Sequence, residues 1–369
     1  MEIYHTIHLQ TSSQAYDILF GKSIMANAAE LPIIEQLQPT KILVLSDSNV
    51  ERLYTRSVVQ GFTNKKFEVH TFTIPSGEPS KSLYQYEQVI SFMLENSFDR
   101  KSLLIAVGGG VVGDLGGFVA ATYMRGIPFI QMPTTILAHD SSVGGKVAIN
   151  HPLGKNTIGA FYQPQAVLYD METLRSLPDN EVKSGLAEVV KHGHIRSPEL
   201  ISWLDKHFRN IQQLDYRTLA GMLYRSCNVK AEIVAVDERE QGIRAFLNFG
   251  HTVAHGIESA LGYGKIPHGL AVAIGMVSAG ILGYQKGIMP LSAMEQIIEI
   301  NHKFSLPCKL PNPLEPQDII EYIYHDKKNI GGELTFVLLK DIGDPTIVKG
   351  ISTEEVISAL REQQKLGSR

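Results

Sequence analysis

The chain has 369 residues, a formal net charge of −4 at pH 7 and 44% hydrophobic residues, so it is long enough for two domains with separate cores. The slight acidity argues against a nucleic-acid-binding protein, which normally carries a basic surplus, and no apolar run approaches the ~20 residues of a membrane span. Because the N-terminus also lacks the pattern of a secretion signal, we expect a cytoplasmic protein that binds neither membrane nor nucleic acid.

Short apolar runs alternate with helical stretches in the first half of the chain. Four of these runs are typical of buried strands, at residues 41–47, 102–107, 129–132 and 166–169. Continuous apolar strands separated by helices indicate a parallel sheet covered on both faces. We therefore predict an α/β N-terminal domain with a Rossmann-like parallel sheet over residues 1–177.

A glycine-rich segment from Gly108 to Asp114 follows the second of these strands and leads into a helix start. Its GxGxxG spacing is typical of a dinucleotide site, where backbone N–H groups and a helix N-terminus receive a pyrophosphate. No acid ends the strand at 129–132, where a ribose-binding carboxylate usually lies, whereas Asp47 ends an earlier strand. The segment predicts nucleotide binding with ribose recognition by Asp47; the alternative is a tight turn without a ligand.

Further polar clusters fall in loops where strands are predicted to end. They are Ser76 to Lys81, Pro133 to Thr135, Asp140 to Lys146 and Gly154 to Asn156. Loops at the carboxyl ends of parallel strands are where α/β proteins bind ligands, and a lysine beside glycines suits contact with phosphate. Each cluster alone fits a plain turn, but together they exceed what turns require.

From Pro178 onward the spacing of apolar residues becomes helical. Asp179 can cap a helix that runs through Glu188 and Lys191, and further helices are predicted at 214–240, 251–261, 269–286 and 291–304. A short strand pair is expected near residues 334–339 and 346–348. The sequence thus predicts a mostly α-helical C-terminal domain over residues 178–369.

Three histidines of this half suggest a metal site. His251 and His255 are four residues apart and share one helical face, and His268 can fold back from the start of the next helix. Converging imidazoles with a carboxylate are a zinc-type ligand set. The alternative is that these histidines cap helices or satisfy polar groups in the core.

Glu188 is our choice for the carboxylate. It lies among apolar neighbours on a helix, where a buried acid needs a partner, although an exposed ion pair with Lys191, three residues on, is the plainer explanation. His192 and His194 are rival ligands, ranked second because they lie off the face shared by Glu188 and Lys191.

Taken together, these motifs resemble the 3-dehydroquinate synthase family over nearly the whole chain and in the same order. The segments that carry the resemblance are Gly108–Asp114, Pro133–Thr135, Asp140–Lys146, Asn150–Asn156, Gly185–Lys191 and Asn248–His255. The resemblance implies an NAD- and zinc-dependent lyase, in which cobalt can replace zinc, that works as a homodimer. It would convert 3-deoxy-D-arabino-heptulosonate 7-phosphate to 3-dehydroquinate and phosphate by transient oxidation, phosphate elimination, re-reduction and aldol closure.

The resemblance also assigns residues. The family's metal ligands fall on Glu188, His251 and His268. Its NAD contacts fall on Asp47, Asn49, Ser76, Gly77, Glu78, Pro79, Ser80, Lys81, Gly109, Gly110, Val111, Val112, Gly113, Asp114, Thr134, Thr135, Lys146, Lys155, Thr173 and Leu174. Its substrate and catalytic positions fall on Asp140, Lys146, Asn156, Lys191, Lys230, Arg244, Asn248 and His255, with Arg125 and Lys327 as cations near the phosphate. Arg125 is a candidate to serve the neighbouring subunit's site.

The chain departs from the family pattern at two places. Only residues 136–139 separate the threonine pair from Asp140, one residue fewer than in many members, which puts the contacts around His139 and Asp140 in question. Leu270 follows His268-Gly269, where many members have an acid; it is no ligand, so we expect little effect.

Three alternatives stay open. Another sugar-phosphate cyclase, such as a 2-deoxy-scyllo-inosose synthase, would use the same cofactors on a substrate without a carboxylate. A metal-dependent polyol dehydrogenase of the glycerol dehydrogenase type would release NADH. A non-enzymatic nucleotide-binding regulator would leave the metal set unexplained.

Overall fold

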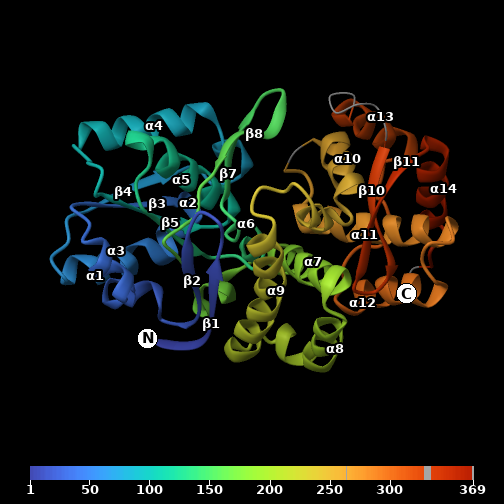
Figure 1. The fold of residues 1–369 in the computed structure, drawn as a ribbon, viewed down its shortest axis with the longest axis horizontal. Coiled ribbons are helices and arrows are strands. Elements are labelled where there is room, and N and C mark those ends of the chain that lie inside the picture. Colours follow the sequence, from blue (N-terminus) through green and yellow to red (C-terminus); the bar gives the residue numbers. More distant parts are fainter. Residues whose placement is uncertain (263, 328–333, 368–369) are drawn as a thin grey trace. The chain divides into compact units, whose positions relative to one another are not determined.

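The computed structural model describes residues 1–262, 264–327 and 334–367. It divides into two compact units, which Figure 1 colours along the chain. The first unit comprises Met1–Leu177 and Asn210–Arg239, and the second comprises Pro178–Arg209 and Glu240–Arg369.

The prediction placed one boundary after residue 177, and the chain does change units there. It returns to the first unit for residues 210–239, because α9 (Tyr216–Val236) packs against strands β1 and β2 of that unit. The helical spacing of this segment was readable from the sequence, but the partner that buries it was not.

The first unit is built around a seven-stranded sheet. Its elements are β1 (Glu2–Gln10), β2 (Ala15–Lys22), η1 (Met25–Glu30), α1 (Pro32–Leu37), β3 (Ile42–Asp47), α2 (Ser48–Val50), η2 (Glu51–Thr55), α3 (Arg56–Asn64), β4 (Val69–Ile74), η3 (Glu78–Ser80), α4 (Leu83–Glu95), β5 (Leu103–Gly108), α5 (Gly110–Thr122), η4 (Tyr123–Arg125), β6 (Phe129–Pro133), α6 (Ala138–Ser141), β7 (Lys146–His151), β8 (Gly154–Phe161), β9 (Ala166–Asp170), η5 (Met171–Ser176) and α9.

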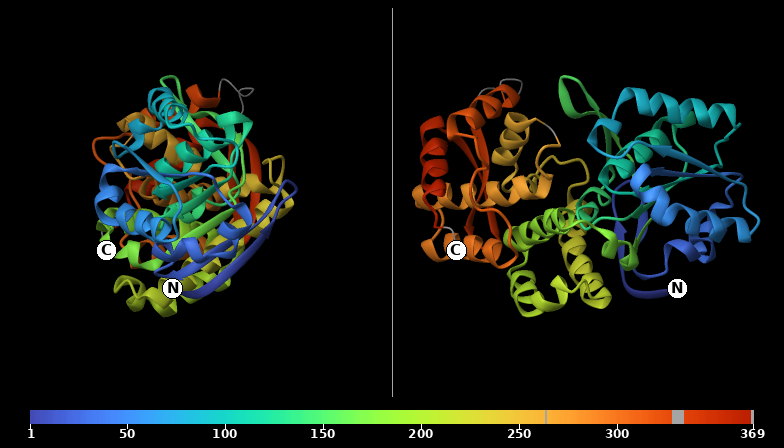
Figure 2. Two further views of the ribbon diagram at one scale, coloured as in Figure 1. Left: turned by 90° about the vertical axis from the view of Figure 1, so that its left-hand side faces the viewer. Right: turned by 180° about the vertical axis from the view of Figure 1, so that it is seen from behind.

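The strand order in this sheet is β1-β2-β9-β6-β5-β3-β4. β1 pairs antiparallel with β2, and every other neighbouring pair is parallel. The four strands expected from the sequence are β3, β5, β6 and β9, so the prediction of a parallel sheet is confirmed. β7 and β8 form a separate antiparallel hairpin, which projects from the body of the unit (Figures 1 and 2).

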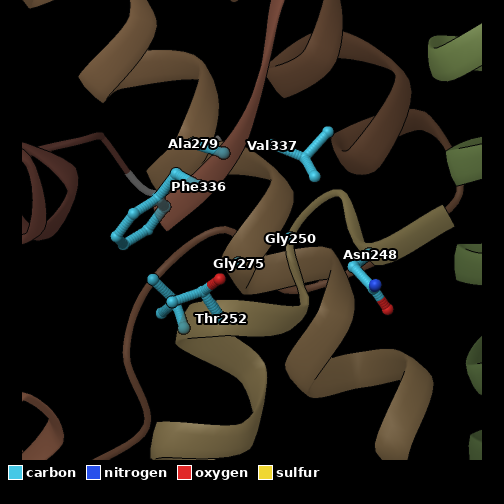
Figure 3. Close-up of a pocket in the computed structure, with 8 residues that line it drawn as sticks. Asn248, Gly250, Thr252, Gly275, Ala279, Phe336 and Val337 are labelled. Carbon is cyan, nitrogen blue, oxygen red and sulfur yellow. The ribbon is translucent and has the colours of Figure 1, made fainter. Parts of the chain in front are cut away.

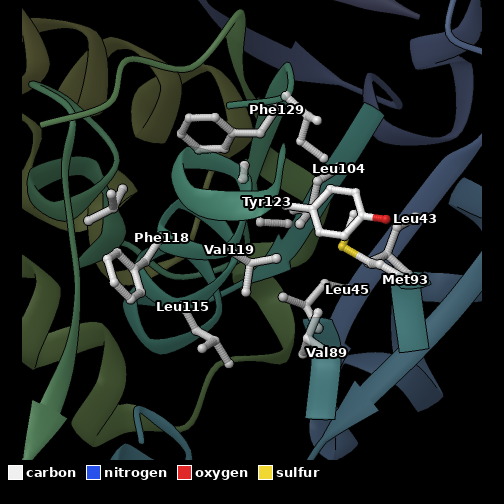
Figure 4. Packing of buried hydrophobic residues seen from close by; sticks show 14 of the residues in the cluster. Leu43, Leu45, Val89, Met93, Leu104, Leu115, Phe118, Val119, Tyr123 and Phe129 are labelled. Carbon is white, nitrogen blue, oxygen red and sulfur yellow. The ribbon is translucent and has the colours of Figure 1, made fainter. Parts of the chain in front are cut away.

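Helices cover both faces of the sheet because alternate strand residues point to opposite sides. Leu43 and Leu45 of β3 face a cluster with α4 and α5, shown in Figure 4. Val44, between them, joins a second cluster with Val58 and Phe62 of α3. Each such fully buried side chain contributes about 1.5–3 kcal/mol of transfer free energy, so the sheet forms a firm base for the loops at its edge.

The second unit is mostly helical, as predicted. It contains α7 (Asp179–Arg196), most of α8 (Pro198–Gln212), η6 (Ile243–Asn248), α10 (His251–Leu261), α11 (His268–Gln285), α12 (Leu291–Lys303), α13 (Pro316–Lys327), β10 (Leu334–Asp341), β11 (Asp344–Ile351) and α14 (Thr353–Gln364). The predicted strand pair is the β10–β11 hairpin. Asp179 is the first residue of α7 and not its cap, which is Pro178.

The centre of the second unit is α11. Helices α7, α10, α12 and α14 and strand β10 all pack against it, an arrangement that the right-hand view of Figure 2 shows from behind. Among the described residues it is the one helix long and apolar enough to cross a membrane, yet 78% of that window is buried inside the protein. A helix that is apolar on all sides suits such a core position, so this length and composition are weak evidence for a membrane span.

Candidate functional site

The carboxyl ends of the parallel strands gather most of the segments predicted to bind a nucleotide. β3 ends at Asp47, β5 ends just before Gly109, and β6 ends just before Thr134. Residues 76–81 follow β4, and Thr173 lies in η5 directly after β9. This edge is the usual ligand-binding edge of an open parallel sheet.

The glycine loop leaves the start of α5 open. Gly109 is the N-cap of α5, and no side chain of the described residues caps it. A Cβ on Gly109 would lie 3.2 Å from Thr135 Cγ2, and one on Gly113 would lie 2.7 Å from Gln131 Oε1. Glycine therefore permits the tight turn and the close packing of helix on strand that a phosphate-binding helix N-terminus needs.

Asp47 has a structural partner of its own. Its Oδ1 accepts hydrogen bonds from the backbone N–H groups of Asn49 at 2.8 Å and Val50 at 3.1 Å, which caps α2. The cap holds the carboxyl group at the end of β3, beside the strand that leads into the glycine loop.

Lys81 forms the centre of a buried polar cluster, and its side chain is only 4% exposed. Its Nζ lies 2.6 Å from Asp114 Oδ2 and 3.9 Å from Glu78 Oε1, and it also donates a hydrogen bond to Asn156 Oδ1. Burial opposes the charged form, but the carboxylates of Asp114 and Glu78 outweigh it and raise the pKa of Lys81. The ammonium thus ties residues 76–81 to α5 and to the β7–β8 hairpin, which begins at Lys146 and includes Lys155.

The shortened connection before Asp140 is anchored on α9. His139 is fully buried, with Nδ1 2.6 Å from the carbonyl of Ile136 and Nε2 2.9 Å from Ser226 Oγ. Because a carbonyl can only accept, Nδ1 carries a proton. Asp140 Oδ1 lies 3.1 Å from Lys230 Nζ, so the structure brings together these two predicted substrate residues.

The second unit brings together the three predicted metal ligands. His251 Nε2 and His268 Nε2 lie 3.7 Å and 3.5 Å from Glu188 Oε1, and the three ligand atoms fall within 4.8 Å of one another. The Glu188 side chain is 1% exposed, and within the described part of the chain neither of its oxygens accepts a hydrogen bond. Lys191 Nζ lies 2.6 Å from Oε2, which balances charge without the alignment of a hydrogen bond.

Two glycine contacts account for this convergence. A Cβ on Gly269 would lie 1.9 Å from the carbonyl oxygen of Ser184, so only glycine lets the start of α11 rest on α7. A Cβ on Gly275 would lie 2.0 Å from the carbonyl oxygen of Gly250, just before α10. These close approaches hold His268 and the start of α10 beside the α7 face that carries Glu188.

The donor set fits a divalent ion. Burial, followed by the ammonium of Lys191, lowers the pKa of His251 well below its ordinary value, so this imidazole is neutral and offers a lone pair. His268 Nδ1 lies 3.1 Å from Glu258 Oε2, which leaves Nε2 turned toward Glu188. Two imidazoles and one carboxylate, with no fourth side chain among the described residues in the set, match a zinc site that keeps an open position.

The other histidines differ from this set. His255 is exposed and forms a second group with Glu258 and His268. His194 is buried and, among the described residues, both of its ring nitrogens lack a hydrogen-bond partner; burial lowers its pKa to about 3. It does not belong to either group, and neither does His192.

The remaining predicted residues are spread over both units. Arg244 is 1% exposed in η6, and Asn248, at the end of η6, lines a small crevice with Thr252 and Phe336 (Figure 3). Arg125 has a φ of 69° in η4, a left-handed conformation that is rare outside glycine and is often found at functional positions. Lys327 is the last residue of α13, and its side chain lies outside the described part of the structure.

Two polar residues without a predicted role contact predicted ligands or binding residues. Glu258 contacts His268, and its position seven residues after His251 on the same helical face was an available signal. Asn150 contacts Glu78 and Asn156; it begins one of the segments that carry the resemblance, but no local pattern indicates these two partners.

Two family models match parts of this chain. Residues 71–184 match the family described as 3-dehydroquinate synthase N-terminal, and residues 185–329 match 3-dehydroquinate synthase C-terminal. A 3-dehydroquinate synthase of Desulforamulus reducens is 46% identical over 358 residues, covering 97% of this chain and 99% of that one. One of Bacillus cereus is 44% identical over 361 residues, covering 97% and 98%.

Among solved structures, a 2-deoxy-scyllo-inosose synthase complexed with carbaglucose-6-phosphate, NAD+ and Co2+ has a TM-score of 0.84 at 25% identity. The alignment covers 97% of this chain and 100% of that chain.

Proposed function

The chain belongs to the 3-dehydroquinate synthase family, and we propose that it converts 3-deoxy-D-arabino-heptulosonate 7-phosphate to 3-dehydroquinate and phosphate as an NAD- and metal-dependent lyase. The observation that carries the proposal is the buried Glu188 carboxylate, which pairs with Lys191 through Oε2 and faces two imidazoles with Oε1, an atom that accepts no hydrogen bond from the described residues. A regulator without catalysis would have no need of such a group.

The proposed cofactors are NAD and one Zn²⁺ or Co²⁺ ion. When bound, NAD supplies a reversible hydride acceptor, and the ion supplies Lewis-acid polarisation of a substrate hydroxyl. The solved cyclase with NAD+ and Co2+ supports this pair of cofactors, and the donor set of Glu188, His251 and His268 supports the ion independently.

The first unit would hold the nucleotide. The N–H groups at the start of α5 suit the pyrophosphate, and Asp47 suits a ribose hydroxyl. Thr134 and Thr135 add hydroxyl groups at the same edge of the sheet. The remaining proposed contacts are Asn49, Ser76 to Lys81, Lys146, Lys155, Thr173 and Leu174.

The substrate's two anionic groups require separate cations. We assign the phosphate to Lys146, Asn156, Arg125 and Lys327, and the carboxylate to Lys230 and Arg244, since a guanidinium pairs with a carboxylate through two hydrogen bonds. Asp140 and Asn248 are assigned to substrate hydroxyls. His255 and Lys191 are the candidates to move protons there; the exposed ring of His255 can exchange them with water.

We further propose a cytoplasmic homodimer in which Arg125 serves the neighbouring subunit. The support is the family resemblance. Light scattering tests the dimer: a mass near 40.8 kDa instead of twice that value would contradict it.

A related cyclase activity is the second candidate. The chain is 46% identical to a 3-dehydroquinate synthase but 25% identical to the 2-deoxy-scyllo-inosose synthase. The buried Arg244 and Lys230 also suit a substrate with a carboxylate, which favours 3-dehydroquinate synthase activity.

The test is turnover with catalytic NAD+. Purified protein with Zn²⁺ or Co²⁺ and substoichiometric NAD+ should release one phosphate per 3-dehydroquinate formed, with no accumulation of NADH. Steady growth of NADH absorbance would indicate a polyol dehydrogenase, and turnover only with glucose 6-phosphate would indicate the other cyclase.

A further inference from the structure

A single amide side chain, Asn150, joins two segments of the first unit. Asn150 is half-buried near the end of β7. Its Nδ2 donates a hydrogen bond to Glu78 Oε1 at 2.8 Å, and its Oδ1 accepts one from the backbone N–H of Asn156 at 2.8 Å. One side chain therefore contacts both the segment after β4 and the start of β8.

The orientation of this amide is fixed by its partners. A carboxylate can only accept and a backbone N–H can only donate, so turning the Asn150 amide over would break both bonds. Its backbone is held as well, because its N–H donates to the carbonyl of Lys81 at 2.8 Å and Asn150 pairs with Ser82 in an isolated bridge.

Both partners lie in backbone that the main sheet does not hold. Asn156 has a φ of 56°, in the left-handed region that asparagine tolerates better than most residues, and its N–H is bound by Asn150. Glu78 opens the short η3 turn after Gly77, whose φ is 104°. Lys81 closes the group by contacting Asp114 and Asn156.

We propose that Asn150 is a positioning residue that orients Glu78 toward the nucleotide and the Asn156 turn toward the substrate's phosphate. The inference rests on the proposed function. It adds that the two binding segments are set by one amide, so disturbing Asn150 disturbs both without removing a group that contacts either ligand.

The hydrogen bond to Glu78 can be tested by reversing its polarity. Asn150→Asp keeps the acceptor for Asn156 but loses the donor and places a carboxylate against Glu78. Calorimetric titration with NAD+ should show a dissociation constant raised about tenfold, within the range for a bond to a charged partner.

Adding Glu78→Gln supplies an amide that can donate to the carboxylate introduced by Asn150→Asp. In the Glu78→Gln background, Asn150→Asp should therefore change the NAD+ dissociation constant less than about twofold, which is a coupling that a double-mutant cycle isolates. An equal change in both backgrounds would overturn the inference. If Asn150→Asp alone fails to fold, recovery of the fold in the double variant supports the bond, and an unfolded double variant contradicts it.

The other half of the inference concerns Asn156. Asn150→Ala removes both bonds and should weaken binding of inorganic phosphate about fivefold or more. If Asn150→Ala binds phosphate within twofold of the wild-type affinity, Asn150 does not orient the Asn156 turn for phosphate binding.

Asn96→Asp is the matched control, since Asn96 caps the end of α4 and its Nδ2 donates, among the described residues, only to the carbonyl of Phe92, at 2.8 Å. It should bind NAD+ and phosphate like the wild type. Wild-type protein that binds no NAD+ would contradict the proposed function itself, whereas normal binding by wild type and Asn150→Asp alike would contradict only the role of Asn150.

Discussion

Two buried charges, one in each unit, have opposite surroundings. In the first unit Lys81 is surrounded by acceptors from Asp114, Glu78 and Asn156. In the second unit Lys191 Nζ lies 2.6 Å from Oε2 of Glu188, but Oε1 faces His251 and His268 and accepts no hydrogen bond from the described residues. Because a buried polar atom without a partner is costly, the Lys81 cluster is complete as it stands, whereas Oε1 of Glu188 is suited to receive a cation.

The largest effect should come from removing the carboxylate of Glu188. Glu188→Gln keeps the shape of the side chain but removes the charge that a divalent ion needs, so turnover should fall by about 10³-fold or more. Metal content by elemental analysis should fall in parallel. Glu199→Gln, on the exposed start of α8, is the control; a metal-loaded, active Glu188→Gln protein would refute the difference between the two clusters.

Removing the ammonium of Lys81, a proposed NAD contact, should also lower stability. Lys81→Met leaves Asp114 without its partner at 2.6 Å, and breaking a buried pair costs about 3–5 kcal/mol. Denaturant unfolding should show a loss of this size in the first unit. A loss of unfolding free energy below about 1 kcal/mol would mean that the ion pair of Lys81 and Asp114 does not stabilise the first unit.

His194 tests whether a buried histidine without hydrogen-bond partners affects stability alone or also the binding of metal. Burial lowers its pKa from 6.5 to about 3, so the unfolded chain binds a proton that the folded protein does not. Stability should therefore fall as the pH drops from about 6.5 toward 3, by up to ~1.4 kcal/mol per pH unit.

His194→Leu removes this proton uptake. Between pH 7 and pH 5 the variant should gain about 2 kcal/mol relative to wild type, measured by denaturant unfolding at both pH values, and its metal content should stay unchanged. Loss of metal in His194→Leu would instead make this histidine part of the metal site.

The smallest effect is expected at Glu258, which contacts His268 Nδ1 at 3.1 Å. Glu258→Gln keeps an acceptor for the ring but removes the charge, and changes in such supporting partners lower metal affinity about 10–100-fold. Competition with a chelator measures this loss, with the exposed Glu362→Gln as control. Unchanged affinity would limit the metal site to its three direct ligands.

The central strands and part of the candidate metal site could be predicted from the sequence. Apolar runs predicted β3, β5, β6 and β9, because strands buried on both faces need no alternation. The four-residue spacing of His251 and His255 predicted one helical face, although the structure pairs His251 with His268 in the candidate set and leaves His255 exposed.

The remainder depends on tertiary contacts that no local pattern records. β1 alternates buried and exposed residues at the edge of the sheet, which gives a weaker signal than the central strands. Segment 210–239 joins the first unit only through its packing on β1 and β2. Asn150 and Glu258 make contacts with partners that are distant or unremarkable in sequence, so these contacts appear only in three dimensions.

The most direct test is an anomalous difference map from crystals of the zinc-loaded protein. We predict one peak about 2.0–2.2 Å from a carboxylate oxygen of Glu188 and from Nε2 of His251 and His268. A zinc-loaded crystal whose peak lay on other side chains, with these three left without the ion, would contradict the account.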